Sequence, residues 1–487
     1  MRQSGVLLHI TSLPSRGGIG TLGQAAYDFV DFVKASGMSI WQMLPIGPTG
    51  YGDSPYQSPC THAGNDMMID LRTLHEEGLS SKTADELLPA SSKWTDTLRN
   101  NKLHALRMSF RESWSKVQSE VDAFVASHPD IADYALYMAV KNYFDGRTWT
   151  IWPDMSIRFR EEKAMSHYTR ILQEDINFYK YIQYIFFRQW NALHDYARSK
   201  GVKILGDMPI YVAEDSSDTW ANPDMFLLDA DRRPVKVAGV PPDYFSEDGQ
   251  LWGNPLYNWR AQKKSGYTWW INRLKTASEL YDIVRVDHFI GFANYYAVKA
   301  GAKNARAGRW EKAPGFSFFR TVQRQLPELK IVAEDLGVVS RRVKRLLRYC
   351  GFPGMKVLQF GFDSDESNPH FISNIRENCV LYTGTHDNDT AEGWWAQAPE
   401  KTKAFAKQFL PERSSISESL IEAALGSVAD TVIVPVQDIL GLGSEARMNA
   451  PGTVGGTNWR WRMQPGELTP QKAMDMRSMN EFFDRNI

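Results

Sequence analysis

Eight short apolar runs, rich in β-branched and aromatic residues, recur along the chain with helical stretches between them. Runs of this kind are typical of buried parallel strands. Several lead directly into charged residues, as in Gly206-Asp207, Asp287-His288 and Glu334-Asp335. Because a (β/α)8 barrel carries its active site at the carboxyl ends of its strands, this pattern predicts such a barrel. The predicted strands are residues 6–10, 40–46, 202–210, 283–286, 331–333, 355–360, 380–383 and 431–436.

The uneven spacing of these runs predicts insertions. Far more residues separate the second and third runs than a crossover helix needs, and apolar residues recur at helical spacing between them. We therefore predict a mainly helical insertion over 72–180 after strand 2, followed by a helix over 177–200 that packs against the third strand. Residues 214–275, after strand 3, are predicted to form a loop-rich insertion, and long loops of this kind are usually functional.

The predicted fold class is therefore α/β. One catalytic (β/α)8 (TIM) barrel spans residues 1–487, with large subdomains inserted between strands and no separate C-terminal β-sandwich domain. Aromatic residues make up 12% of the chain, which suits a core and also a cleft that stacks on sugar rings or bases.

Charge and cysteine content argue against several classes of function. The 56 basic and 57 acidic residues leave a net charge of −1, so there is no electrostatic basis for binding nucleic acid or an anionic membrane. The widely spaced Cys60, Cys350 and Cys379 form neither a disulfide framework nor a CxxC zinc clip. No apolar stretch approaches the ~20 residues of a membrane span or the core of a signal peptide. We predict a cytoplasmic protein.

Motifs for cofactors are weak. Gly18-Ile19-Gly20-Thr21-Leu22-Gly23 matches GxGxxG, but the second run has no Asp or Glu to bind a ribose hydroxyl, and eight strands argue against a doubly wound sheet. A tight turn before a helix is the better interpretation of these glycines. The chain has no HExxH or EF-hand pattern, so no catalytic metal is indicated and we predict no cofactor.

Three carboxylates, Asp287, Glu334 and Asp387, each follow a different predicted strand. Cleavage of a glycosidic bond needs one protonated carboxyl, which gives a proton to the leaving oxygen, and one ionised carboxylate, which attacks the anomeric carbon. Arg285 lies two residues before Asp287 on the same strand face, and a nearby cation favours the ionised form, which suits a nucleophile. Glu334 ends an apolar run, where a raised pKa suits a general acid. Asp387 remains as a third group that stabilises positive charge.

Each carboxylate also has a structural interpretation, because Asp and Glu after strands often cap the next helix. We assign Asp335 and Asp389 to that role. A second Ala-Glu-Asp at residues 213–215 shows that the tripeptide alone identifies nothing, and Glu334 is preferred because it directly follows its strand. His288 and His386 could be core histidines. Because they lie beside the carboxylates, a role in contacting sugar hydroxyls is supported at least as well.

Long blocks around these residues resemble the 4-α-glucanotransferases of glycoside hydrolase family 77, called amylomaltase in bacteria and disproportionating enzyme in plants. The blocks span nearly the whole chain and occur in the family's order. They are Gly50-Tyr51-Gly52-Asp53-Ser54-Pro55-Tyr56-Gln57-Ser58, Gly206-Asp207-Met208-Pro209-Ile210, Gly239-Val240-Pro241-Pro242-Asp243-Tyr244-Phe245, Trp252-Gly253-Asn254-Pro255-Leu256-Tyr257, Arg285-Val286-Asp287-His288-Phe289, Ala333-Glu334-Asp335-Leu336-Gly337, Pro353-Gly354-Met355-Lys356-Val357-Leu358-Gln359-Phe360 and Thr385-His386-Asp387-Asn388-Asp389-Thr390.

The resemblance implies a retaining transglycosylase in which Asp287 is the nucleophile, Glu334 the general acid/base and Asp387 the transition-state stabiliser. It implies that Arg285, Asp207 and His386 contact the sugar at the cleavage site or orient the nucleophile. It also implies that donor and acceptor are maltooligosaccharides or other α-1,4-glucans, and that the 214–275 insertion borders the glucan groove. The remaining substrate-binding positions that it implies are Tyr51, Ser54, Tyr56, Asp243, Trp252 and Asn458.

The chain departs from the family pattern at three places: Ile290 replaces the usual Arg, Asp66 replaces Pro, and the segment 453–458 is longer than usual. None of these changes removes a catalytic carboxyl, but all should border the groove. Two other functions use part of the same residues. An α-amylase-type hydrolase would use the same carboxyls with water as acceptor, and a non-catalytic glucan-binding protein would need the groove aromatics without the acid pair.

Overall fold

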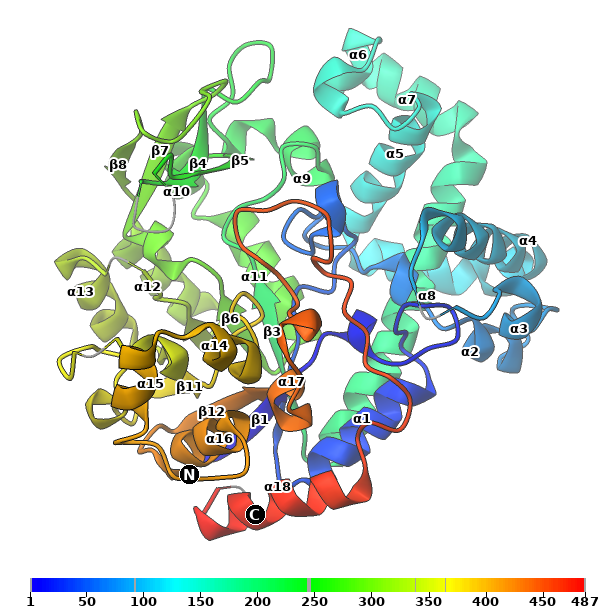
Figure 1. Ribbon diagram of the computed structural model, residues 1–487. Coiled ribbons are helices and arrows are strands. Elements are labelled where there is room, and N and C mark those ends of the chain that lie inside the picture. Colours follow the sequence, from blue (N-terminus) through cyan, green and yellow to red (C-terminus); the bar gives the residue numbers. More distant parts are fainter. Residues whose placement is uncertain (1, 92, 243–246, 338, 364, 486–487) are drawn as a thin grey trace.

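The structure is a computed structural model that describes residues 2–91, 93–242, 247–337, 339–363 and 365–485. Its centre is a sheet of eight parallel strands in the order β10-β11-β12-β1-β2-β3-β6-β9 (Figure 1). The backbone N–H of Ala333 donates to the carbonyl of Pro353 at 2.9 Å, which links the last strand to the first. The strands are β1 (Gln3–Leu7), β2 (Ile40–Gln42), β3 (Lys203–Met208), β6 (Ile283–Val286), β9 (Ile331–Ala333), β10 (Gly354–Val357), β11 (Cys379–Tyr382) and β12 (Thr431–Pro435).

These eight strands confirm the predicted barrel. Their apolar residues are buried on both faces, as in β11, where all four residues are buried. The clearest difference from the prediction is β1, which begins at Gln3 and pairs with Thr431 of β12, three residues earlier than predicted. Residues 8–10 lie beyond the strand and are buried, and η1 (Ile10–Ser12) begins there.

Helices surround the barrel with one apolar face turned inward. In α13 (Arg341–Cys350) the buried residues Val343, Leu346 and Cys350 recur at helical spacing, while Arg341, Arg345 and Arg348 are exposed. The Ser340 side chain caps its first turn, and Gly351 ends it in the left-handed conformation. The other outer helices include α1 (Gln24–Ala35), α8 (Gln173–Ser199), α11 (Thr268–Leu280), α12 (Gly315–Gln325), α16 (Ile416–Gly426) and α18 (Pro470–Phe482).

The segment between β2 and β3 is mainly helical and forms the cyan part of the molecule (Figure 1). Its longest helix, α4, begins after Thr95, whose side chain accepts from Leu98 N, and α5 begins with Pro129, a residue well suited to the first helical turn. Both helices pack against α8, which in turn contacts β3. The helices are α2 (Leu71–Glu76), α3 (Ala84–Leu87), α4 (Asp96–Ser127), α5 (Pro129–Tyr143), α6 (Met155–Arg158) and α7 (Glu162–Ile171).

A second sheet, which the sequence analysis does not predict, lies beside the barrel. It is antiparallel and has the order β5-β4-β7-β8. Two of its strands fall in the range 214–275, predicted as loop-rich, and the other two follow β6. Short strands interrupted by Gly and Pro give little alternation, which is why the pattern is missed. The strands are β4 (Lys236–Val240), β5 (Gln250–Pro255), β7 (Asn294–Lys299) and β8 (Arg309–Lys312).

After β12 the chain crosses the carboxyl ends of the barrel strands. Residues 447–463, here called the strap, run over the centre of the molecule before α18 packs against α1 (Figure 1). Within residues 436–485 the regular elements are helices, the first being α17 (Val436–Leu440). No helix in the described part of the chain is long and apolar enough to cross a membrane.

Candidate active site

Asp207 and Arg285 form a buried ion pair at the ends of neighbouring strands. They face each other in the register of β3 and β6, so their side chains leave the sheet on the same side. Arg285 Nη1 donates to Asp207 Oδ1 at 2.7 Å and to Oδ2 at 2.6 Å, and the side chains are 5% and 0% exposed. The contact follows directly from the strand register.

This pair should contribute strongly to stability, since removing one partner leaves a buried charge. We expect Asp207→Ala to lower the free energy of unfolding by about 3 to 5 kcal/mol. Urea unfolding measures the change. Glu481→Ala, which breaks the exposed Arg477–Glu481 pair on α18, is the control, and it should cost less than about 1 kcal/mol. An Asp207→Ala loss no larger than that of the control would contradict the buried pairing.

Asp287 lies within reach of the same arginine. Arg285 Nη1 is 3.0 Å from Asp287 Oδ1, and 27% of the Asp287 side chain remains exposed. The two residues lie on one face because they are two positions apart at the end of β6. Arg285 is thus placed between a fully buried carboxylate, Asp207, and a partly exposed one, Asp287.

Glu334, immediately after β9, is held by backbone donors. His288 N donates to Oε2 at 2.7 Å and Leu336 N donates to Oε1 at 2.6 Å. The backbone of His288 is left-handed, with φ of 48°, in the turn that follows Asp287. The Glu334 carboxyl therefore lies against the turn that carries Asp287, and both predicted catalytic groups are tied to the same backbone.

Burial raises the pKa of both carboxyls. For Asp287, the charge of Arg285 opposes burial, while Asp207, Glu334 and Asp387 raise its pKa further. For Glu334, Arg285 and the two backbone N–H groups oppose the effect of burial. Burial thus acts on the pKa of Glu334 in the expected direction. Arg285 lowers the pKa of Asp287, as expected, but burial and the three nearby carboxylates raise it by more.

His386 and Tyr56 complete the floor of the site. The Tyr56 hydroxyl donates to Asp207 Oδ2 at 2.7 Å and lies 2.9 Å from His386 Nε2. The two rings are stacked, with centroids 5.4 Å apart, and His386 Nε2 is 3.3 Å from Asp387 Oδ1. Burial lowers the pKa of His386. Side chains from three distant parts of the sequence thereby meet around the Asp207–Arg285 pair.

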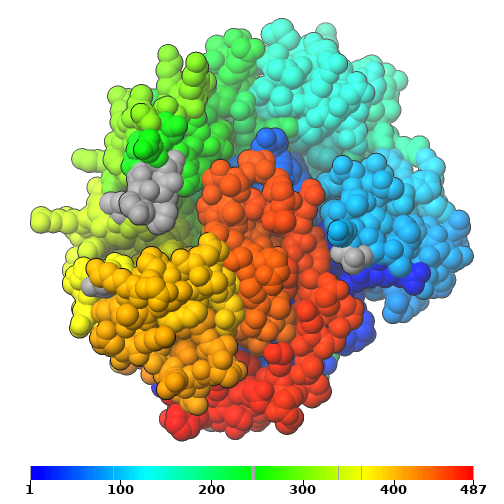
Figure 2. Space-filling view, in the orientation of Figure 1, coloured from blue at the N-terminus to red at the C-terminus, as the bar shows by residue number. Residues whose placement is uncertain are grey.

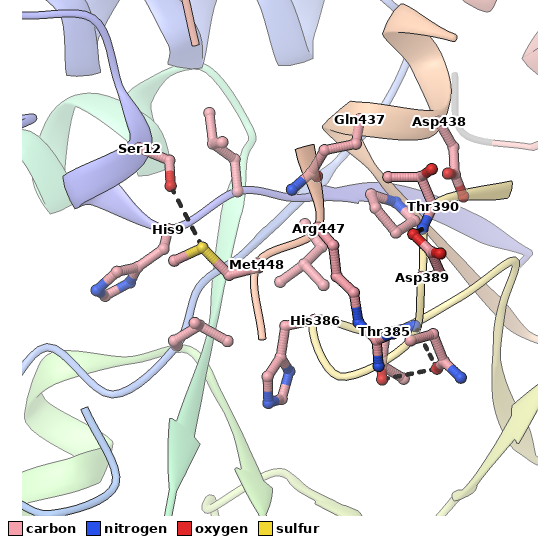
Figure 3. Close-up of a pocket in the computed structure, with 15 residues that line it drawn as sticks. His9, Ser12, Thr385, His386, Asp389, Thr390, Gln437, Asp438, Arg447 and Met448 are labelled. Carbon is pink, nitrogen blue, oxygen red and sulfur yellow. Dashed lines mark hydrogen bonds between the residues drawn. The ribbon is translucent and has the colours of Figure 1, made fainter. Parts of the chain in front are cut away.

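Asp387 is held from the strap. Asn449 Nδ2 donates to Asp387 Oδ1 at 2.7 Å, and Arg447 Nη2 donates to the Asp387 carbonyl at 2.7 Å. The side chain of Asp387 is 44% exposed, so its second oxygen is open to a ligand. Figure 3 shows Arg447 and Met448 of the strap reaching between His9 and the segment Thr385–His386.

The loop that carries Asp387 is anchored on α17. Asp438 accepts from Thr383 Oγ1 at 2.6 Å and from Ala391 N at 2.8 Å, one contact at each end of the loop. Figure 3 shows Asp438 on the far side of the cavity from His9. Burial raises the pKa of Asp438 to about 6, although both hydrogen bonds oppose this. The loop geometry is thus fixed by a buried carboxyl outside the site itself.

The other predicted site residues differ in exposure and in whether they border the site. The Trp252 ring meets His288 edge to face, with centroids 4.8 Å apart, and so borders the site. Tyr51 is 79% exposed, and the Ser54 hydroxyl accepts from Tyr56 N at 3.3 Å. Asn458 accepts from Ala450 N and donates to Thr453, so its amide braces the strap. Asp243 lies outside the described residues.

Two site residues are missed by the sequence analysis. Asn449 contacts Asp387, and the Trp459 ring lies 5.8 Å from Tyr56 and 6.1 Å from His386. Both lie far from any strand, so a search at strand ends could not select them. The signal that remains is local, since Asn449 and Trp459 flank the lengthened segment 453–458 in a stretch rich in Asn, Gly and Trp.

Two of the departures from the family pattern, Ile290 and Asp66, are buried and half-buried, respectively. Ile290 is 5% exposed and belongs to the hydrophobic core. Asp66 begins η3 (Asp66–Met68), where burial raises its pKa and the charges of Arg99 and Lys102 oppose the rise. In the part of the chain that the structure describes, no group of three His, Cys, Asp or Glu side chains could hold a metal ion.

The family model of the 4-alpha-glucanotransferases matches residues 8–469. The chain belongs to this family. A 4-alpha-glucanotransferase of Thermus thermophilus is 46% identical to it, with 99% of each chain covered. The chloroplastic or amyloplastic enzyme DPE1 of Arabidopsis thaliana is 42% identical over 95% of this chain and 81% of its own length.

The barrel and its insertions are also those of solved members of the 4-alpha-glucanotransferase family. The amylomaltase of Streptococcus agalactiae, solved in complex with acarbose, superposes with a TM-score of 0.97 at 39% identity and full coverage of both chains. The amylomaltase of Corynebacterium glutamicum shares the fold, with a TM-score of 0.79 at 18% identity over 100% of this chain and 75% of its own.

Proposed function

We propose that this chain transfers a segment of a 1,4-α-D-glucan to the 4-hydroxyl of glucose or of a second glucan, through a covalent glycosyl-enzyme. The observation that carries the proposal is the convergence of Asp287, Glu334 and Asp387, from three different strand ends, around Arg285. Burial raises the pKa of Glu334, which suits an acid that must stay protonated, while the charge of Arg285, 3.0 Å from Asp287, favours the ionised form that a nucleophile needs.

The proposed reaction has two displacements. Glu334 gives a proton to the glycosidic oxygen while Asp287 attacks the anomeric carbon, which forms a β-linked ester and releases the first product. Glu334 then takes the proton of the acceptor 4-hydroxyl as that oxygen attacks the anomeric carbon, which frees Asp287 and restores an α-1,4 bond. Asp387, with one oxygen held by Asn449, stabilises the positive charge of both transition states.

The buried groups around Asp287 are assigned a positioning role. Arg285 is held by two bonds to Asp207, and it orients the Asp287 carboxylate through its third. Tyr56 and His386 extend this network toward Asp387. Because the geometry of attack must be met closely, such groups act by holding the nucleophile rather than by exchanging protons.

Transfer requires that an acceptor sugar competes successfully with water. Trp252, Tyr56 and Trp459 offer aromatic faces around the site, and the strap lies over it. A site that binds the acceptor in attacking geometry and limits access of water favours transfer over hydrolysis. Maltooligosaccharides and other α-1,4-glucans are the proposed donors and acceptors. The free, buried Cys60, Cys350 and Cys379 are compatible with the proposed cytoplasmic location.

Incubation with maltotriose alone tests this function. We expect glucose and a ladder of longer maltooligosaccharides without a net gain of reducing ends, because each transfer breaks and re-forms one α-1,4 bond. Chromatography of the products, together with a reducing-end assay, measures both quantities. Glucose and maltose with rising reducing ends would instead identify a hydrolase, and no change in either quantity would contradict an enzymatic role on this donor.

A further inference from the structure

Asp53, at the end of η2 (Tyr51–Asp53), contacts two arginines from distant parts of the chain. Arg99 Nη2 donates to Asp53 Oδ1 at 2.5 Å, and Arg460 Nη2 donates to Oδ2 at 3.2 Å. The backbone of Asp53 is left-handed, with φ of 60°, as is that of Gly52 before it, with φ of 69°. This turn points the carboxylate at both arginines. We call Asp53, Arg99 and Arg460 the clasp.

The clasp joins two segments that touch the site. On one side, η2 leads to Tyr56, whose hydroxyl contacts Asp207 and His386. On the other side, Arg460 belongs to the strap and directly follows Trp459, whose ring packs near Tyr56 and His386. Among the residues that the structure describes, Asp53, Arg99 and Arg460 form no hydrogen bond or ion pair with the proposed catalytic carboxyls, so any effect on the reaction is transmitted through these segments.

Further contacts hold the same segments together. A Cβ placed on Gly52 would lie 3.2 Å from Val454 Cγ1, so the exposed tip of the strap rests against η2. Arg99 lies near the start of α4, so the clasp also ties the helical insertion to the strap. Figure 2 shows the orange and red strap crossing the face of the molecule beside the blue and cyan segments. Three regions of the sequence thus meet at one carboxylate.

We propose that Asp53 is a positioning residue that fastens the strap to residues 51–56, and that the clasp sets the fraction of glycosyl-enzyme that ends in transfer rather than hydrolysis. The inference rests on the proposed function. In hydrolysis, a water oxygen attacks the anomeric carbon, Glu334 takes the water proton and Asp287 leaves as a carboxylate. A strap that opens more often admits water and holds the acceptor less well, which favours this outcome.

Because the clasp residues are partly exposed, the strength of their ion pairs should depend on salt concentration. The side chains of Asp53, Arg99 and Arg460 are 30%, 31% and 52% exposed, and ion pairs at such positions are weak and screened by salt. Raising the NaCl concentration from about 0.05 to 0.5 M, which shortens the Debye length severalfold, should therefore raise the hydrolysed fraction of the wild-type enzyme.

Asp53→Asn tests the proposal with little disturbance of the backbone, because Asn tolerates the left-handed conformation. We expect the ratio of hydrolysis to transfer on maltotriose to rise about two- to fivefold, with total turnover little changed. Arg460→Gln should give a similar rise. The double variant should give no larger a rise than Asp53→Asn alone, since that change already removes the charged contact with Arg460. The salt dependence of the ratio should be smaller in all three variants.

Arg413→Gln is the matched control, because Arg413 has the same 52% exposure and pairs with Glu422 away from the strap. The ratio of hydrolysis to transfer in Arg413→Gln should equal that of the wild type. A fall in turnover and melting temperature with an unchanged ratio in Asp53→Asn and Arg460→Gln would overturn the proposal, as would additive effects in the double variant. Failure of the proposed function is distinguishable, since the wild-type protein would then form no ladder at all.

Discussion

Glu334→Gln is expected to lose turnover on maltotriose by about 10³-fold while it still binds glucans. The glycosidic oxygen is a poor leaving group unless it is protonated, and the amide of Gln cannot supply the proton. An α-maltosyl fluoride needs no such proton, so the first displacement on this donor should be much less affected. Fluoride release, product analysis and calorimetric binding of maltotetraose measure the three quantities.

Asp335→Asn is the matched control for this variant. The prediction that Asp335 caps the next helix is wrong, because Ser340 caps α13; the Asp335 carboxylate instead accepts from Met355 N at 2.7 Å and links β9 to β10. Turnover should remain within severalfold of the wild type, since an Asn oxygen can accept the same bond. Unchanged turnover of Glu334→Gln on maltotriose would rule out Glu334 as the general acid. Equal losses on maltotriose and on the fluoride, with binding lost, would show that Glu334 shapes the site instead of donating a proton.

The barrel could be predicted from the sequence because parallel strands buried on both faces leave a strong local signal. Ile283–Val286 and Ile331–Ala333 are apolar runs that begin and end where the pattern places them. The antiparallel sheet left no such signal. In β4, Gly239 pairs with both Leu251 and Tyr296, and β5 contains Gly253 and Pro255, so the alternation that marks a half-buried strand is lost.

The candidate site likewise contains residues that the sequence predicts and residues that only the structure reveals. Asp287 and Glu334 could be predicted because each directly follows a strand, and the barrel topology brings strand ends together. The contacts of Asp387 could not be predicted in this way. Asn449 reaches it from the strap, 62 positions away in sequence, and no periodicity connects the two residues. The roles of loop residues depend on tertiary contacts, which only the structure provides.

The net shift in the pKa of Asp287 could be derived only from the structure, for a different reason. The sequence places Arg285 beside Asp287, and that contact is present at 3.0 Å. The sign of the net effect on the pKa of Asp287, however, depends on burial and on the distances to Asp207, Glu334 and Asp387. Those three residues come from three other strand ends. An argument along one strand therefore identified Arg285 and the direction of its effect, but the contributions of burial and of the other carboxylates required the structure.

Asp287→Asn should abolish transfer and hydrolysis alike, with a loss on the order of 10⁴-fold or more, as removal of a covalent nucleophile does in other enzymes. Without the carboxylate no ester can form, so the fluoride donor, which is expected to bypass Glu334, should not restore the reaction. The variant should still fold, because Arg285 keeps both bonds to Asp207. Circular dichroism and a melting curve check the fold, and release of fluoride measures the first displacement.

The intermediate itself gives the sharper measurement. Mass spectrometry of the wild-type protein, denatured during turnover of a slowly hydrolysed glycosyl fluoride, should show one added glycosyl group on the peptide that contains Asp287. The adduct should be absent from Asp287→Asn. Asp389→Asn is the matched control, because the Asp389 carboxylate accepts from Ser444 Oγ at 2.7 Å and from Gln397 of α14 (Ala391–Gln397). Thr390, not Asp389 as predicted, caps this helix. Asp389→Asn should keep the adduct and most of the turnover. An adduct on any other residue, or near-normal activity of Asp287→Asn, would contradict the assignment of the nucleophile. An adduct on Asp287 in both the wild type and Asp389→Asn would show that the covalent bond forms at the residue that follows β6.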